Sequence, residues 1–450
     1  MFKYLVIIVL LATTLFAADT FVTVYNQNLA LIKEVRNINI ESEDAPVYYP
    51  DVASQIIPAT VRIRSLDNPK SFKVLEQNYE YDLVSADKIL EKYIDHQVEL
   101  VLEDGTIITG KLLSQAGRHI VIKTDNGIKL VPFSDDLMVQ VKDLPEGLIT
   151  RPTLVWHLAG TGKGKETVEV SYLTRGMTWR AEYVGVLNEN DSRLSLDSWV
   201  SIKNESGVAF KEANLKLVAG DIHLVQQPPE ELYFSRREQV DAFAAKAPAA
   251  GFAERQFFEY HIYELGRKTT LKQMQEKQIT LYPPASVGCT KKFYYDAVKD
   301  AENILIGIEF KNDEKSGLGK PLPAGIVRIY KQDKEGMEFV GEDRIEHTPR
   351  KEDVKLSIGK AFDLKAERLV KDRKNISKRG RRDNVEIELR NNKKDQDVVI
   401  TVVEHLNYPE WKVESSNFQF RKVSANKIEF DIPVAKDSKT TLQYTIQYSW

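Results

Sequence analysis

The chain has 450 residues, of which 42% are hydrophobic and 29% are charged. This composition is typical of a folded, soluble protein and excludes an intrinsically disordered one. The formal net charge of −3 excludes a strongly basic nucleic-acid-binding protein and an acidic buffer protein. A chain of this length is expected to form about two to four domains.

The first 18 residues predict a secretory signal peptide. A lysine near the start is followed by an apolar segment, and Ala17 and Ala18 supply small residues before Asp19. The apolar segment is shorter than the roughly 20 residues of a membrane span. We therefore expect an exported protein, periplasmic or secreted. Cleavage is expected after Ala17 or Ala18, and no transmembrane span is expected in the mature chain.

Residues 19–78 predict an N-terminal β segment. Val22 and Val24 alternate with Phe21, Thr23 and Tyr25, which is the period of two that half-buried strands show. The turn after this run contains two asparagines, and the alternation then resumes. The pattern predicts paired strands from the first mature residues onward.

Residues 79–147 predict a different unit, a short helix followed by a small barrel. Ser85 is a suitable N-cap for a helix. The dipeptides Asp104-Gly105 and Asn126-Gly127 are typical of tight hairpin turns between short strands. Gly110 is expected to allow strong bending of its strand. This organisation is similar to an inserted Sm- or SH3-like barrel.

Sm-like barrels often bind single-stranded RNA through polar and stacking side chains in their loops. The usual loop motif of such barrels contains an acidic residue and an asparagine. This motif is missing here, because the chain reads LSQAGRHIVI after Leu112. We therefore favour a structural or protein-contact role, and Sm-like nucleic-acid binding is the second alternative.

The remaining sequence predicts a β-sandwich segment over 148–225, a linker or flexible loop over 226–255, and a C-terminal β-sandwich region over 256–450. The stretch SYLTRGMTWRAEYVGVL, residues 171–187, predicts a hairpin that turns at Gly176. Trp179 and Tyr183 are expected to face inward, and Arg180 and Glu182 to form an exposed charged face. The fold class is therefore expected to be mainly β and multidomain, with β-sandwich-like units.

Several long motifs resemble one family, the domain-of-unknown-function 4139 group, which is related to mucoidy inhibitor A-like proteins. The motifs include VYNQNLALIKEVR, EGLITRPTLVWHLAG, YLTRGMTWRAEYV, NESGVAFKEANLKLVAGDI and GLGKPLPAGIVRIY. The resemblance covers nearly the whole mature chain and implies an exported member of this group. The long coiled coil of some relatives is replaced here by the small barrel, and the family supplies no catalytic residues to transfer.

The residues Glu259, His261 and Tyr263 are the most suggestive polar row, because alternate residues of a strand share one face. If this row met Arg180 in a concave cleft, it would support acid-base chemistry. A solvated or hydrogen-bonded sheet face is the simpler interpretation. The histidines also lack zinc-site spacing, so we expect no catalytic, cofactor-binding or metal site.

The single cysteine and one basic run are two further features that could bear on function. The single cysteine, Cys289, excludes an intramolecular disulfide and lies in PPASVGCTKK, which lacks a nucleophile motif. The basic run over residues 365–384 is able to bind anionic head groups or polysaccharide, although a solvated loop is the simpler interpretation.

Together these features predict an exported cell-envelope protein that binds or scaffolds without catalysis, with no cofactor. Its partner is expected to be an envelope protein or a polysaccharide, and not a nucleic acid. The main alternative is an envelope hydrolase or carbohydrate-active module.

Overall fold

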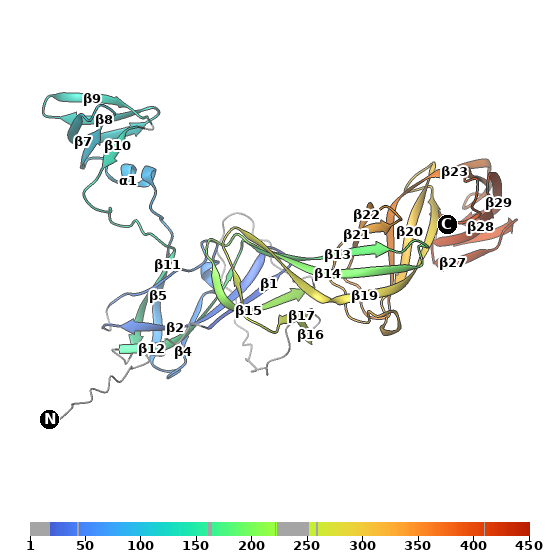
Figure 1. Ribbon diagram of the computed structural model, residues 1–450, viewed down its shortest axis with the longest axis horizontal. Coiled ribbons are helices and arrows are strands. Elements are labelled where there is room, and N and C mark those ends of the chain that lie inside the picture. The colour runs from blue at the N-terminus through green and yellow to red at the C-terminus, as the bar shows by residue number, and fades with distance from the viewer. Residues whose placement is uncertain are drawn as a thin grey trace, which may run out of the picture. The chain divides into compact units, whose positions relative to one another are not determined.

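The computed structural model describes residues 19–42, 45–134, 136–160, 164–220, 222, 252–257, 260–408 and 410–450. The expected signal peptide and most of the expected linker lie outside these residues. The linker prediction is wrong at its end, because strand β16 (Phe252–Phe257) begins inside it. The described chain is mainly β, as the sequence predicts, with strands arranged in several sheets (Figure 1).

Contacts divide the chain into two compact units, each built from several segments. The first unit comprises Met1–Thr178, Lys203–Lys216 and Lys268–Gln275. The second comprises Trp179–Ile202, Leu217–Arg267 and Glu276–Trp450. The sequence therefore alternates between the two units, and a division into consecutive domains does not describe it.

The first unit contains a β-sheet formed by segments that are distant in the sequence. Its order is β15-β1-β2-β12-β4, and β18 pairs with β15. These strands are β1 (Asp19–Tyr25), β2 (Leu29–Ile40), β4 (Arg62–Ser65), β12 (Gly164–Thr174), β15 (Phe210–Ala219) and β18 (Thr269–Leu271). The predicted alternation is confirmed in β1, where Val22 and Val24 are fully buried.

A three-stranded sheet of order β3-β11-β5 also belongs to the first unit. Its strands are β3 (Val47–Pro50), β5 (Phe72–Glu80) and β11 (Thr153–Gly160), and the short 3-10 helix η1 spans Pro58–Thr60. Trp156 is fully buried here, its ring centroid lies 5.5 Å from that of Tyr49, and its indole N–H donates to Gln77. Burial of such large rings supplies much of the stabilisation of a β core.

Within the first unit, helix α1 (Ala86–Lys92) and a five-stranded antiparallel sheet form what we call the small module. Ser85 caps the helix as predicted, since its hydroxyl accepts a hydrogen bond from the Lys88 amide. The sheet order is β10-β6-β7-β8-β9, and closure into the expected barrel is not established by these pairings. Its strands are β6 (Gln97–Val101), β7 (Ile107–Ala116), β8 (His119–Thr124), β9 (Gly127–Pro132) and β10 (Met138–Gln140).

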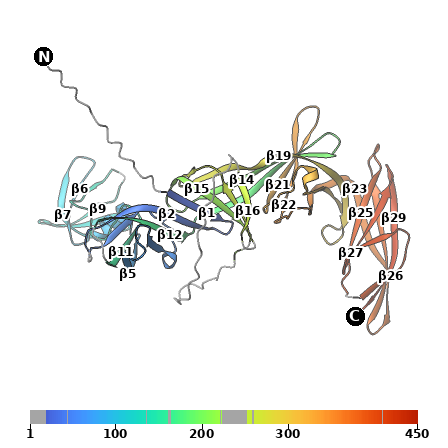
Figure 2. The same ribbon diagram turned by 90° about the horizontal axis from the view of Figure 1, so that it is seen from below.

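The second unit contains a large sheet of order β22-β21-β13-β14-β19-β20-β23-β24-β29-β26, with β25, β27 and β28 attached through β19. Strands β24 and β29 pair along their whole length, and Figure 2 shows β29 together with the other C-terminal strands β25 and β27. The strands and the 3-10 helix are β13 (Met177–Leu187), β14 (Arg193–Asn204), β17 (Tyr260–Leu265), β19 (Gln275–Asp296), β20 (Asn303–Lys311), η2 (Glu314–Ser316), β21 (Gly325–Gln332), β22 (Met337–Ile345), β23 (Asp353–Ser377), β24 (Gly380–Asn391), β25 (Val398–His405), β26 (Glu410–Ser416), β27 (Phe420–Ser424), β28 (Lys427–Val434) and β29 (Ser438–Ser449). Strands β16 and β17 pair antiparallel with each other and do not belong to this large sheet.

The C-terminal strands enclose one continuous hydrophobic core. Buried side chains from β24 and β29 meet those from β25 and β28, and the rings of Phe430 and Tyr444 lie 5.4 Å apart across this core. Two β layers packed in this way form the sandwich-like arrangement that the alternating sequence predicts.

The predicted hairpin around Gly176 is wrong. Strand β12 pairs with β2 and β4, whereas β13 pairs with β14 and β21, so the two strands belong to different sheets. The residues between them are bound elsewhere: the Arg175 amide donates to the Gln55 carbonyl oxygen, and the Glu205 amide donates to the Gly176 carbonyl oxygen. Gly176 has a φ of +81°, which favours glycine. The local sequence predicts this turn correctly, but it carries no information on which sheet the next strand joins.

Candidate functional site

The aromatic side of β13 lies in the core, as predicted. Trp179, Ala181 and Tyr183 are buried. The Trp179 indole N–H donates to the Val218 carbonyl oxygen over 3.1 Å, and the Tyr183 hydroxyl donates to the Pro323 carbonyl oxygen over 2.8 Å. These side chains therefore stabilise the fold, and every polar atom named here has a partner.

The prediction of an exposed charged face on β13 is wrong for Glu182. Its residue exposure is only 8%. One carboxylate oxygen accepts from Arg180 Nε over 2.8 Å, and the other accepts from Gln278 Nε2 over 3.1 Å. The hydrogen bond that Arg180 donates to Glu182 raises the pKa of Arg180, which also donates to Glu276. The carboxylate is buried because its charge is compensated by these donors, so the group is structural.

The predicted row of Glu259, His261 and Tyr263 does not form a continuous polar face. Glu259 lies outside the described residues. Tyr263 is 1% exposed and lies in the core, where burial raises the pKa of its hydroxyl. His261 is partly buried, and its Nδ1 lies 2.7 Å from Glu254 Oε1.

The alternative of a hydrolytic cleft requires Glu259, His261 and Tyr263 to converge with Arg180 or another carboxylate. Arg180 bonds to Glu182 and Glu276, whereas His261 bonds to Glu254. The two groups therefore belong to separate ionic networks in the described structure, and the carboxylate beside His261 comes from β16. Arg180 therefore does not meet His261, whereas Glu254 places another carboxylate beside it, and the hydrolase alternative stays a prediction.

The basic run over residues 365–384 forms strands, and the prediction of a solvated loop is wrong. It comprises the end of β23, a two-residue turn at Lys378 and Arg379, and the start of β24. Residues 369–377 are exposed on both faces, so the sequence lacks the alternation that identifies a strand. Most of its cations form ion pairs with carboxylates of the same chain. The pairs are Arg368–Glu404, Lys371–Glu386, Arg373–Asp383, Lys374–Asp372, Arg381–Asp383 and Arg382–Glu414.

Cys289 lies on β19 and is held as a neutral thiol. Its Sγ donates to the Asp191 carbonyl oxygen over 3.6 Å. Burial, assisted by the Asp191 carboxylate, raises the pKa of Cys289 to about 11. The thiolate is the reactive form of cysteine, so the folded environment opposes a nucleophilic role.

We expect iodoacetamide to alkylate Cys289 about a hundredfold more slowly at pH 8 in the folded protein than in urea. The folded rate should rise about tenfold per pH unit towards pH 11. The stabilisation from holding a neutral thiol is fully present below the pKa of the unfolded thiol, and it is lost as the pH rises through about 11. Equal folded and unfolded rates at pH 8 would contradict this assignment.

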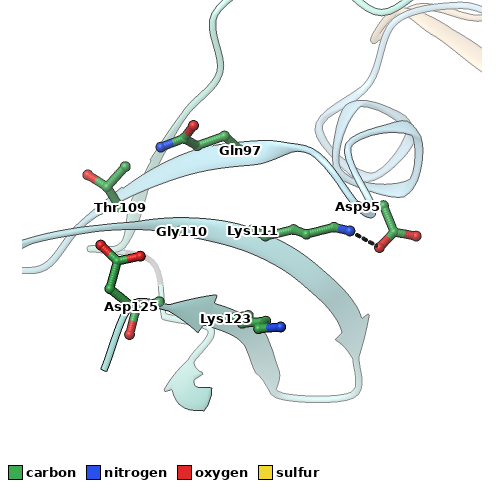
Figure 3. A pocket seen from close by; sticks show the side chains of 8 residues that line it. Asp95, Gln97, Thr109, Gly110, Lys111, Lys123 and Asp125 are labelled. Carbon is green, nitrogen blue, oxygen red and sulfur yellow. Dashed lines mark ion pairs between the residues drawn. The ribbon is translucent and has the colours of Figure 1, made fainter. Parts of the chain in front are cut away.

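The small module carries a polar hollow of about 520 Å³ (Figure 3). Gln97 on β6, Thr109 and Lys111 on β7, and Lys123 on β8 contribute to its lining. Lys111 forms an ion pair with Asp95 over 2.8 Å, drawn as the dashed line in Figure 3. The remaining lining residues are Gly110, Thr124 and Asp125.

A second hollow of about 450 Å³ adjoins the first, because Gln97 and Thr109 line both. Its other lining residues are Val98, Glu99, Gln140, Val141 and Lys142. The charges balance in each hollow: two aspartates and two lysines line the first, and one glutamate and one lysine line the second. Together the hollows form a polar strip with no excess of either charge.

Exposed aliphatic side chains flank this polar strip on the same face of the sheet. Directly paired residues of an antiparallel sheet share a face, and Met138, Val101 and Ile107 are paired in one row across β10, β6 and β7. Ile128 and Leu130 extend the same face on β9, opposite Lys123 and Val121. The residues Ile107, Ile128, Leu130 and Met138 are between 58% and 67% exposed. We call these four side chains and the two hollows the outer face of the small module.

The outer face was not among the sites predicted from the sequence. The sequence nevertheless contains a pattern that indicates this face. The alternation that buries Val98, Leu100 and Ile108 places Gln97 and Thr109 on the opposite side of the sheet. Gly110, which also lines the first hollow, packs closely against β8, since an added Cβ would lie 2.5 Å from the Lys123 carbonyl oxygen.

Among the described residues, no group of three or more His, Cys, Asp or Glu side chains is placed to hold a metal ion. In the same part of the chain, no helix has the length and apolar character needed to cross a membrane. No protein-family model matches the chain, and no curated protein matches it. The resemblance to the domain-of-unknown-function 4139 group therefore stays a prediction.

Proposed function

We propose that this protein is an exported, non-catalytic binding protein of the cell envelope that docks a partner protein on the outer face of the small module. The observation that carries the proposal is the set of four exposed aliphatic side chains around the polar hollows. An antiparallel sheet with one solvated face normally places polar residues there. A cluster of exposed apolar groups with polar neighbours is typical of a protein-interaction surface.

The charge of the outer face defines the partner's chemistry. Its lysines are matched by aspartates and glutamate, so a partner gains no attraction from net charge alone. A polyanion such as RNA is therefore disfavoured. The matching partner surface is apolar with hydrogen-bonding groups and no net charge, and the resemblance to exported proteins supports a partner in the envelope.

The experiment is chemical crosslinking in intact cells, followed by purification of the tagged protein. We expect a discrete crosslinked species with the wild-type chain and its loss in a variant carrying Ile107→Asp and Leu130→Asp. Both positions are exposed, so the variant should remain folded. Val298→Asp is the matched control because Val298 is 77% exposed and lies outside the small module.

Two results would contradict the proposal. In the first, the crosslinked species survives in the Ile107→Asp and Leu130→Asp variant. In the second, the purified protein binds single-stranded RNA at low salt with a steep salt dependence, which would favour the Sm-like alternative. Turnover of an envelope polysaccharide would favour the hydrolase alternative.

A further inference from the structure

A separate pocket of about 270 Å³ lies in the second unit, next to the His261–Glu254 pair. His261, Pro321, Pro349, Arg350 and Lys351 line it. It differs from the hollows of the small module because two cations and an imidazole line it, and no carboxylate is among its lining residues. The lining side chains come from β17 and from two loops.

The buried Asn312 fixes both loops. Asn312 is 0% exposed. Its side-chain amide donates to the carbonyl oxygens of Lys320, over 2.8 Å, and Pro349, over 2.9 Å. Its backbone carbonyl oxygen accepts from the Lys351 amide over 2.7 Å. A single side chain therefore holds the Pro321 loop and the Pro349 loop in a fixed relation.

The base of the pocket is also rigid. Pro321 is buried, and its carbonyl oxygen accepts from the Tyr282 hydroxyl over 2.8 Å and from the Tyr263 hydroxyl over 3.3 Å. His261 is oriented by Glu254, which occupies its Nδ1 and leaves Nε2 for a ligand. The pocket is thus preorganised, which lowers the entropic cost of binding.

The two cations that line the pocket, Arg350 and Lys351, are exposed. Among the described residues, neither Arg350 nor Lys351 forms an ion pair, whereas most cations of the basic run are paired. Lys351 has a φ of +71°, a left-handed conformation that lysine rarely adopts. An arginine fork and a lysine ammonium suit the oxygens of a phosphate group.

We propose that this pocket binds a phosphate group through Arg350, Lys351 and His261. Arg350 and Lys351 supply the positive charge, and the imidazole supplies a further polar contact. The site is independent of the outer face of the small module, and it adds recognition of an anionic ligand to a protein that otherwise has balanced charge.

Equilibrium dialysis of the full mature protein against radiolabelled inorganic phosphate tests the proposal. We expect saturable binding, weakened about tenfold or more in a variant carrying Arg350→Gln and Lys351→Gln, since the variant removes both charged donors. His261→Ala should also weaken binding. Both cations are exposed, so these variants should remain folded.

The matched control carries Lys378→Gln and Arg379→Gln. These residues form an adjacent, exposed basic pair at the β23–β24 turn, and the variant makes the same charge change. It should bind phosphate like the wild type, as should the Ile107→Asp and Leu130→Asp variant. Absence of saturable binding, or equal weakening by the control, would overturn the proposal.

Free metabolites and lipids both carry phosphate groups, and two further probes distinguish these sources. Glycerol 3-phosphate competing with labelled phosphate identifies a free ligand. Sedimentation with vesicles of phosphatidylglycerol, lost in the Arg350→Gln and Lys351→Gln variant but not with its matched control, identifies a lipid head group. Either result assigns the source of the phosphate group, whereas absence of saturable binding of inorganic phosphate rejects the site.

Discussion

Replacement of Arg368 by alanine is expected to lower the free energy of unfolding by about 3–5 kcal/mol. Arg368 on β23 makes two hydrogen bonds of 2.9 Å to the carboxylate of Glu404 on β25. Glu404 is 5% exposed and also accepts from the Tyr444 hydroxyl over 2.6 Å. Removing the guanidinium leaves a buried, uncompensated carboxylate. Urea denaturation of the mature protein measures the loss.

Two comparisons isolate the cause. Arg382 pairs with Glu414 at the surface, so Arg382→Ala should cost no more than about 1 kcal/mol. Combining Arg368→Met with Glu404→Leu removes both charges and should recover most of the stability lost in Arg368→Ala. If Arg368→Ala and Arg382→Ala had equal effects, the buried carboxylate would not be the source of the destabilisation.

Replacement of Trp179 by alanine is expected to cost about 3–5 kcal/mol of unfolding free energy. The side chain is buried, and its ring lies 6.1 Å from that of Tyr263 in an edge-to-face arrangement. Alanine leaves a cavity beside Tyr263 and removes the indole donor from the Val218 carbonyl oxygen. Thermal unfolding should show a lower midpoint for the transition of the second unit.

Trp199 provides the matched control for this substitution. It is also a tryptophan of the second unit, on β14, but it is 37% exposed. Trp199→Ala should therefore destabilise the protein by a smaller amount, and Trp179→Phe should retain most of the stability lost in Trp179→Ala. Equal loss from Trp179→Ala and Trp199→Ala would show that burial does not determine the effect.

The sequence predicted the local structure well because local structure depends on neighbouring residues. Alternation located the strands, and it correctly placed Trp179 and Tyr183 in the core. The Ser85 cap was also correct. The hairpin between β8 and β9 turns at Asp125 and Asn126, one residue before the predicted dipeptide.

Strand pairing was not predictable because the partners are distant in the sequence. Strand β13 pairs in parallel with β21, and Ala181 lies opposite Gly325. A Cβ at Gly325 would lie 2.2 Å from the Ala181 carbonyl oxygen, so this pairing requires glycine. That requirement becomes visible only when the partner strand is known. The same reason explains why the turn at Gly176 was located correctly while its hairpin was not.

The candidate sites were missed for a related reason. Alternation placed Gln97 and Thr109 on the outer side of their strands, but a hollow also requires several strands in a known register. The phosphate pocket requires Asn312 to bring together loops that are nearly 30 residues apart, around Pro321 and Pro349. The prediction that Glu182 is exposed was wrong for the same reason, because its hydrogen-bond partner Gln278 lies on another strand.

The interleaving of the two units has a consequence for biogenesis. Strand β1 is among the first described segments of the chain, yet its neighbour β15 ends only at Ala219, and β18 follows at Thr269–Leu271. A chain that folds from its N-terminus therefore exposes one edge of β1 until nearly half of its 450 residues have emerged. Unpaired edges promote aggregation, so protection by a chaperone during synthesis or translocation would benefit this topology.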